Sequence, residues 1–131
     1  MLLIDSSAWI DHLKHADSPS RLDVVRAVRE GTAATTDQVV LEVLAGASDA
    51  RRLAAWQGML NACEFVPQLP YVDAESAARV YRTCRRAGET PRALADCLIA
   101  AIAIRTSATV LHRDKDFDVI TRYTTLQVVS A

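Results

Sequence analysis

Long apolar runs, cysteine and histidine are all scarce in this sequence, and each shortage argues against a class of protein. The longest apolar run, residues 97–104, is far shorter than the roughly 20 residues that an α-helix needs to cross a bilayer. The three cysteines show no Cys-x-x-Cys spacing, so they predict buried free thiols rather than a disulfide framework or a zinc site. The first residues also lack the basic stretch of a signal peptide, and we therefore expect a protein of the reducing cytoplasm with no membrane contact.

Apolar residues as a whole are plentiful, and the basic residues are unevenly chosen. The length suits one domain, which we place at residues 1–131, and half of the chain is hydrophobic, which is enough for a packed core. Of the 15 basic residues 13 are arginine, and five of these crowd one segment: Arg79, Arg82, Arg85, Arg86 and Arg92. Because arginine can bind phosphate through two hydrogen bonds, this segment is a candidate phosphate contact. The alternative is a solvated helix face in a genome that favours arginine codons.

Strand-like and helix-like segments alternate along the chain. Short apolar strands are expected at residues 2–4, 33–35, 64–66, 109–111 and 126–129. Between them, Ser18-Pro19 and Thr90-Pro91 are helix start signals with proline at the first helical position, and Asp73 is expected to cap a further helix. The alternation predicts an α/β fold with a parallel sheet and helices on both faces. In such a sheet, ligands bind beyond the carboxyl ends of the strands.

Carboxylates stand where several of these apolar segments end. The set is Asp5, Glu42, Asp96, Asp114 and Asp116. A carboxylate at the edge of a core is costly unless it is paired or binds a cation, and several that converged would repel one another. Oxygen ligands alone suit Mg²⁺ or Mn²⁺ rather than zinc, and the three histidines form no ligand set with them. The pattern therefore predicts a divalent metal site at the edge of the sheet.

Each acid also has a simpler explanation. Asp5, which the two following serines could orient, equally fits a helix cap. Glu42 fits a solvent-facing position on a helix, and so does Asp96. Against this, Asp96 in the second turn of its helix continues a stripe of small residues that would let the helix approach the sheet. The sequence 114–116, Asp-Lys-Asp, fits an ordinary turn when it is taken alone.

Four stretches of the chain are, in order, similar to a known family: LLIDSSAWID at residues 2–11, VVLEVLAGA at 39–47, RALADCLIAAIAI at 92–104 and TVLHRDKDFDVI at 109–120. With them the chain resembles the PIN-domain proteins of the VapC toxin type, the ribonuclease half of bacterial toxin–antitoxin pairs, over essentially its whole length. The resemblance implies a compact three-layer α/β/α sandwich with a central parallel sheet. Ser6 stands where the family often has threonine, which keeps the hydroxyl.

The same resemblance implies roles for individual residues. The catalytic acids would be the quartet Asp5, Glu42, Asp96 and Asp114, with Asp116 as a fifth participant. The metal site would consist of Asp5, Asp96, Asp114 and Asp116. Asp5 and Asp96 are the first choices for direct ligands, whereas Glu42 and Asp114 would act through bound water. The spacing does not decide which of Asp114 and Asp116 is the closer ligand. The expected substrate contacts are Ser6, Arg86, Arg92 and Arg113.

The activity that the resemblance implies is that of an endoribonuclease toxin. It would use Mg²⁺, with Mn²⁺ as a substitute, to cleave structured RNA such as tRNA or rRNA by attack of a metal-activated water on a phosphodiester. The implied partners are a VapB-type antitoxin and a second copy of the chain. We expect apolar surface for the antitoxin near Trp9, Leu44 and Trp56, and for the homodimer near Tyr81 and Ile102.

Two other classes of function compete with this interpretation. A phosphoaspartate enzyme of the haloacid-dehalogenase type needs a second aspartate two residues after Asp5, but Ser7 stands there, and a receiver domain would need its phosphoacceptor after a third strand. A non-catalytic module that docks a basic peptide in an acidic pocket remains the alternative. Magnesium-dependent cleavage of RNA by the purified chain would separate these possibilities.

Overall fold

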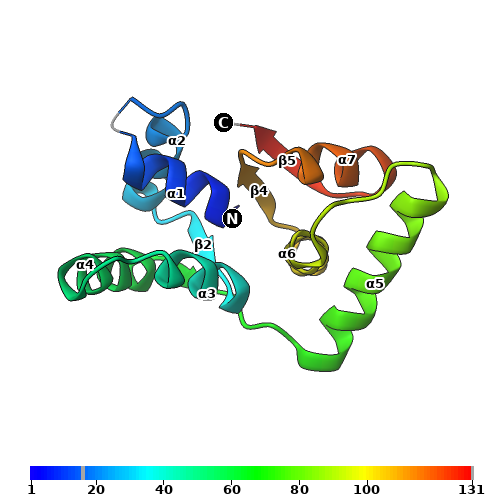
Figure 1. Ribbon diagram of the computed structural model, residues 1–131, viewed down its shortest axis with the longest axis horizontal. Coiled ribbons are helices and arrows are strands. Elements are labelled where there is room, and N and C mark those ends of the chain that lie inside the picture. The colour runs from blue at the N-terminus through cyan, green and yellow to red at the C-terminus, as the bar shows by residue number, and fades with distance from the viewer. Residues whose placement is uncertain (16, 131) are drawn as a thin grey trace.

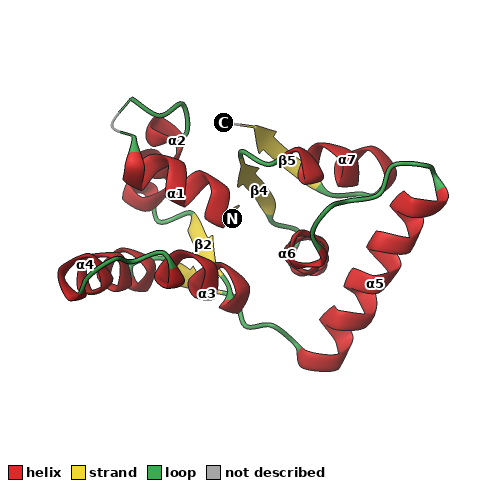
Figure 2. Cartoon of the chain, viewed as in Figure 1, coloured by secondary structure: helices red, strands yellow, loops and turns green. Residues whose placement is uncertain are grey.

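The computed structural model describes residues 1–15 and 17–130, which form a parallel sheet flanked by helices (Figure 1). The strands are β1 (Leu2–Ile4), β2 (Ala33–Thr35), β3 (Glu64–Phe65), β4 (Thr109–His112) and β5 (Gln127–Ser130). The helices are α1 (Ser6–Lys14), α2 (Arg21–Glu30), α3 (Asp37–Ala45), α4 (Ala50–Asn61), α5 (Pro70–Arg86), α6 (Leu94–Thr106) and α7 (Lys115–Tyr123). The predicted α/β fold with a parallel sheet is confirmed. Figure 2 shows how short the strands are beside the helices that connect them.

The order of the strands creates a switch point at the centre of the sheet. The order is β3-β2-β1-β4-β5, and every neighbouring pair is parallel. From β1 the chain moves outward through β2 and β3, then returns to the other side of β1 to place β4 and β5. Leu3 pairs with Ala34 on one side and with Val110 on the other. Ligand sites of open parallel sheets lie at the carboxyl ends of strands beside such a switch point, here the ends of β1 and β4.

The core explains why the central strands are short and apolar. Leu3, Ile4, Ala34, Val110 and Leu111 are all at most 1% exposed, as expected for a parallel sheet covered on both faces. Helix α6 packs against β4, α3, α5 and α7. Its apolar side chains are buried around most of its circumference, which is typical of a helix inside a protein. This burial holds the start of α6 close to the sheet.

Several helix boundaries differ from the predicted ones, and the reasons are local. Helix α5 begins at Pro70, so Asp73 lies in its first turn instead of capping it. Asp73 is buried and accepts hydrogen bonds from the Leu69 backbone N–H and from Arg105. Helix α6 begins at Leu94, not at Thr90-Pro91, which moves Asp96 from the predicted second turn to the first. Thr90-Pro91 has the sequence signals of a helix start, but residues 90–93 form a loop before α6 begins at Leu94.

The remaining sequence-level expectations concern cysteines and membranes. The three cysteines are free; Cys84 and Cys97 are buried and Cys63 is partly exposed. Among the helices of the described residues, none combines the length and the apolar character that spanning a membrane requires.

Candidate metal centre

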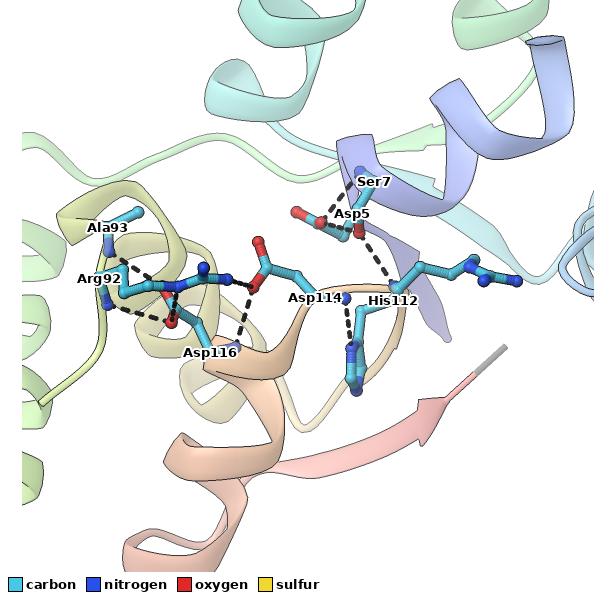
Figure 3. Close-up of polar contacts among 8 residues, drawn as sticks. Asp5, Ser7, Arg92, Ala93, His112, Asp114 and Asp116 are labelled. Carbon is cyan, nitrogen blue, oxygen red and sulfur yellow. Dashed lines mark hydrogen bonds and ion pairs between the residues drawn. The ribbon is translucent and has the colours of Figure 1, made fainter. Parts of the chain in front are cut away.

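The predicted carboxylates meet at the carboxyl edge of β1 and β4 because each stands at the start of a helix or on a helix that faces this edge. Asp5 follows β1 and caps α1, and Asp114 follows β4 and caps α7. Asp116 lies in the first turn of α7, Asp96 lies in the first turn of α6, and Glu42 comes from α3. Figure 3 shows the Asp114 side chain between Asp5 on one side and Asp116, with Arg92 and Ala93, on the other.

Three of these acids lie close enough together to bind one ion. One carboxylate oxygen from each of Asp96, Asp114 and Asp116 lies within 4.8 Å of the others. Asp5 is outside this tight group, but it is near enough for the charges of Glu42 and Asp114 to raise its pKa. The sequence-based prediction that separate segments bring their acids to one place therefore holds geometrically. The assignment of individual catalytic and ligand roles stays a prediction.

Asp5 is a buried carboxylate with one occupied oxygen and one free oxygen. It is 2% exposed, and its Oδ2 accepts hydrogen bonds from the Ser7 hydroxyl and, at 3.0 Å, from the Ser7 backbone N–H. Burial raises the pKa of Asp5 to about 6, although the Ser7 hydrogen bonds oppose the shift. Its Oδ1 is buried and has no hydrogen-bond partner among the described residues. Asp5 thus caps α1 through Oδ2, and its Oδ1 is the candidate metal ligand.

Asp96 is more strongly perturbed. It is 5% exposed, and its Oδ2 is also buried without a hydrogen-bond partner among the residues the structure describes. Burial, a hydrogen bond shared with Asp116 and the nearby charge of Asp5 raise the pKa of Asp96 to about 9. In the metal-free protein, Asp96 is therefore the acid that carries the proton of this cluster.

Asp116 behaves in the opposite way. Burial alone would raise its pKa, but the pKa is lowered because the Arg92 and Ala93 backbone N–H groups and Asp96 donate hydrogen bonds to it. The Arg92 N–H lies 3.0 Å from Asp116 Oδ1, and the Ala93 N–H lies 2.9 Å from Oδ2. Both oxygens of Asp116 are thus occupied by backbone donors, as Figure 3 shows.

Glu42 is held by two polar neighbours. The Ser6 hydroxyl donates a hydrogen bond to Glu42 Oε2, and Gln38 Nε2 donates one to Oε1 at 2.7 Å. Ser6 was predicted to contact substrate, but here its hydroxyl orients a carboxylate, and the substrate contact stays a prediction. Gln38 was not singled out from the sequence, although its spacing of four residues before Glu42 on a helix is a signal that could have identified it.

The residues present fit a hard divalent cation. The donor set is made of carboxylate oxygens, which Mg²⁺ and Mn²⁺ prefer. The unpartnered oxygens of Asp5 and Asp96 are buried, and such groups are costly unless something compensates them. Burial and, to a smaller extent, repulsion between the acids raise the pKa values of both, and a cation would offset that repulsion.

The predicted arginine contacts lie at different distances from the acids. The Arg92 guanidinium is 3.8 Å from Asp114 Oδ1 and 3.6 Å from Asp116 Oδ1, and its side chain is 77% exposed. Arg113 instead lies 3.7 Å from Asp11 on α1, and its backbone N–H donates to the Ser7 hydroxyl at 3.0 Å. Arg86 is exposed in the last turn of α5. Of the three, Arg92 is the one that reaches the carboxylates.

His112 supports the site, a role that the sequence left undecided. It is 1% exposed at the end of β4, and its Nδ1 accepts a hydrogen bond from the Asp114 backbone N–H at 3.1 Å. Burial lowers its pKa, which favours the neutral imidazole that this hydrogen bond requires. His112 therefore shapes the turn that presents Asp114.

Comparison with known proteins places this geometry in a family. The model of the PIN domain matches residues 2–123. Ribonuclease VapC11 of Mycobacterium tuberculosis is 41% identical over 132 residues, an alignment that covers 99% of this chain and 98% of that protein. VapC ribonuclease Mb1587 of Mycobacterium bovis matches to the same extent.

Solved structures agree at the level of the fold. VapBC of Salmonella typhimurium, solved with bound DNA, has a TM-score of 0.78 at 18% identity, covering 98% of this chain and 96% of that one. FitAcB of Neisseria gonorrhoeae has a TM-score of 0.76 at 20% identity, again covering 98% and 96%. The sequence matches over the whole length and the acidic edge of the sheet lead to one conclusion. The chain belongs to the PIN-domain family, as one of its VapC ribonucleases.

Proposed function

We propose that this VapC ribonuclease is a Mg²⁺-dependent endonuclease for structured RNA, such as tRNA or rRNA, and the toxin of a toxin–antitoxin pair. The observation that supports the metal dependence is that Asp5 Oδ1 and Asp96 Oδ2 are buried and have no hydrogen-bond partner among the described residues. Asp96 also lies in one tight group with Asp114. Buried carboxylate oxygens with no hydrogen-bond donor are able to bind a cation. The other oxygen of Asp5, Oδ2, already accepts hydrogen bonds from the Ser7 backbone N–H and hydroxyl.

Each residue would bind the metal, orient a neighbouring side chain or accept a proton, depending on which of its oxygens lack a hydrogen bond. Asp5, Asp96 and Asp114 would hold the ion, and Mn²⁺ could replace Mg²⁺. The bound ion would supply an acidified water and would offset charge on the leaving oxygen. Ser7 keeps Asp5 oriented, and Ser6 with Gln38 keeps Glu42 at the rim of the site. Glu42 is only half-buried, so it is suited to accept a proton from water there.

Arg92 is the best-placed substrate contact. Its backbone is fixed by Asp116, while its exposed guanidinium lies beside the carboxylates. A mobile guanidinium at the rim of an acidic site can bind the phosphate of an incoming strand with two hydrogen bonds. Arg86 is proposed as a second phosphate contact, farther along the strand. Arg113, which is close to Asp11, would need to leave that carboxylate first.

We propose two protein partners. One similar structure is described as a toxin–antitoxin complex of Klebsiella pneumoniae, and another as a member of the VapBC family of toxin–antitoxin systems of Mycobacterium tuberculosis. These likenesses support a small cognate antitoxin that covers the acidic site. A second copy of the chain is the other partner. Leu41 on α3 and Leu94 on α6 are 63% and 66% exposed, and they are better candidates for this contact than the residues predicted from sequence. Ile102 and Trp9, which were expected on partner surfaces, are both 0% exposed and belong to the core.

The test is cleavage by the purified chain. Total tRNA and ribosomal RNA should be cut in the presence of Mg²⁺ or Mn²⁺, with new ends that carry a 5′-phosphate and a 3′-hydroxyl. Excess EDTA should stop the reaction, and added Mg²⁺ should restore it. The Asp96→Asn variant is the control for a contaminating nuclease. Cleavage that continues unchanged in EDTA would rule out the proposed metal dependence, and an inactive but metal-binding chain would favour the acidic docking module.

A further inference from the structure

Asp116 differs from the other acids of the site in what its two oxygens contact. Oδ1 accepts the Arg92 N–H at 3.0 Å, and Oδ2 accepts the Ala93 N–H at 2.9 Å. The side chain is buried, at 4% exposure, and it comes from the first turn of α7. A carboxylate from one helix therefore binds the backbone of the residues that lead into another helix, α6.

Arg92 and Ala93 immediately precede Leu94, the first residue of α6, at a point where backbone donors need partners. The first N–H groups of any helix have no acceptor within the helix itself. Ala93 is the N-cap residue of α6, and its methyl side chain cannot accept a hydrogen bond. Asp116 supplies the missing acceptor from a distance of 23 residues along the chain. It accepts the N–H of the N-cap residue itself, which is what the acidic side chain at N3 does in a capping box.

The placement of Asp96 makes this contact important for the site. Asp96 is the third residue after the N-cap, the position whose acidic side chain commonly turns back to accept the N-cap N–H in a capping box. Here the Ala93 N–H is already bonded to Asp116. Asp96 is consequently not needed as a cap, and its Oδ2 stays buried with no hydrogen-bond partner in the part of the chain that the structure describes.

A second contact fixes the same loop to the other end of α7. Glu89, in the segment between α5 and α6, accepts hydrogen bonds from the Tyr123 hydroxyl and from Arg122. The loop is thus attached to the first turn of α7 by Asp116 and to the last turn by Glu89. Two attachments restrict the loop more than either contact alone, and the start of α6 is carried with it.

We propose that Asp116 is a positioning residue that caps α6 in place of Asp96, leaving Asp96 free for the metal, and is not itself a metal ligand. The proposal rests on the proposed function only in assigning Asp96 to the metal. It also decides the question that spacing alone left open: Asp114 is the closer ligand, and Asp116 holds the helix that carries Asp96.

The direct test measures the two backbone amides. In the metal-free protein, hydrogen exchange followed by NMR should show protected N–H groups at Arg92 and Ala93, and saturating Mg²⁺ should leave them protected. In Asp116→Ala both amides should exchange roughly tenfold to a hundredfold faster, as expected for losing hydrogen bonds to a charged acceptor. Asp118→Ala, a change of the same kind on the same helix, is the matched control and should not alter them.

Metal affinity separates a positioning residue from a ligand. Loss of a ligand charge in Asp114→Asn should weaken Mg²⁺ binding by about tenfold or more, since even neighbours of metal ligands have effects of that size. Asp116→Asn keeps an oxygen that can accept the Ala93 N–H, so calorimetry should show a smaller loss. An equal loss in the two variants would overturn the proposal. So would wild-type amides at Arg92 and Ala93 that become exposed to exchange when Mg²⁺ binds.

These readouts need no RNA, so they are independent of the nuclease activity. If the chain cleaves no RNA but the exchange and Mg²⁺ results hold, the proposed function fails and the positioning role stands. If Asp116→Ala does not fold, the wild-type exchange experiment with and without Mg²⁺ still decides the matter.

Discussion

At the scale of single residues, the acids of this site are chemically alike but are made different by their partners. Asp5 is bonded by Ser7 through one oxygen, Asp116 is bonded by backbone donors through both, and Asp96 keeps one buried oxygen without a donor. The same side chain is a helix cap, an anchor or a candidate ligand, depending on which N–H groups reach it. Two predictions follow from Asp96 and Asp5, and one from Arg92.

Asp96→Asn should abolish cleavage and leave the fold intact. The substitution preserves shape and removes a carboxylate that the metal-free protein buries only by keeping its proton, because burial raises the pKa of Asp96 to about 9. In EDTA at pH 8 the variant should therefore be more stable than the wild type, by about 1 kcal/mol or more in urea denaturation. Retained cleavage with normal Mg²⁺ affinity would show that Asp96 is not a ligand.

The stability of the metal-free protein should fall as pH rises between about 5 and 9. Folded Asp5 and Asp96 have pKa values raised to about 6 and about 9, so they hold protons that the unfolded chain has already released. This contribution is complete below the unfolded pKa near 3.8 and is lost as pH rises through each folded value. Urea denaturation in EDTA across this range is the measurement, and Asp96→Asn should flatten the upper part of the curve. Saturating Mg²⁺ should reverse the trend, because metal binding requires deprotonated carboxylates.

Arg92→Ala should weaken RNA binding by a term that depends on salt. If the guanidinium contacts one phosphate, the plot of log affinity against log salt concentration should become less steep by about 1. The loss of affinity should be similar for different RNA sequences. Arg29→Ala is the matched control. Arg29 lies in the last turn of α2, just before β2 begins, and therefore at the amino ends of the strands and not at the carboxyl ends where the acids lie. An unchanged salt slope in Arg92→Ala would remove Arg92 from the substrate path.

At the scale of secondary structure elements, α6 is the part on which the site depends most. It carries Asp96 at its first turn and Arg105 at its last. Arg105 donates to both oxygens of Asp73 at 2.8 Å and to the Pro67 carbonyl at 3.1 Å. Asp73 is 0% exposed, so this pair ties α6 to the start of α5 across a buried contact.

Arg105→Ala should destabilise the protein by about 3 kcal/mol, because it leaves the Asp73 carboxylate buried without its charged partner. Burial favours protonated Asp73, but the Arg105 hydrogen bonds outweigh it and lower the pKa of Asp73. The stability from this pair is therefore lost only when pH falls through that lowered pKa. The double variant Asp73→Ala with Arg105→Ala should lose less stability than the sum of the two single changes in urea denaturation. Strict additivity would mean that the pair is not coupled.

At the scale of the whole molecule, the acidic site lies at the carboxyl edge of β1 and β4, where Glu42 and Asp114 are partly exposed. An active ribonuclease needs control, and a partner that covers the site must satisfy several carboxylates at once. An arginine or lysine side chain from the partner can do this. Leu41 and Leu94 are exposed apolar side chains, which we propose as a separate contact for a second copy of the chain.

Co-expression with the product of the adjacent small reading frame should give a stable complex with suppressed ribonuclease activity. Gel filtration and RNA cleavage by the same fractions are the measurements, and Asp96→Asn co-expressed in parallel should form the complex without any activity to suppress. If the two proteins purify separately and growth inhibition is unchanged, the neighbour is not the antitoxin.

Much of the architecture was predictable from residues whose surroundings are local. Leu2 to Ile4 followed by Asp5 indicated a buried strand that ends at a functional edge, and the structure has β1 there with Asp5 at its end. Asp73 was less predictable, because a side chain in the first turn of a helix and one at its cap have the same local sequence signals. Ile102 was placed on a surface because the pattern of an entirely apolar helix has no distinguishable outer face.

The alternation of strands and helices, and with it the parallel sheet, was readable from the sequence alone, since apolar period and helix signals act over a few residues. The sequence also indicated that carboxylates, and not thiolates or imidazoles, would meet at the sheet edge. Which carboxylate oxygens lack a donor among the described residues became visible in the folded chain, because that depends on donors brought from distant segments, as when the N–H groups of Arg92 and Ala93 reach Asp116. A hydrogen bond between residues far apart in the chain leaves no pattern in the sequence near either of them.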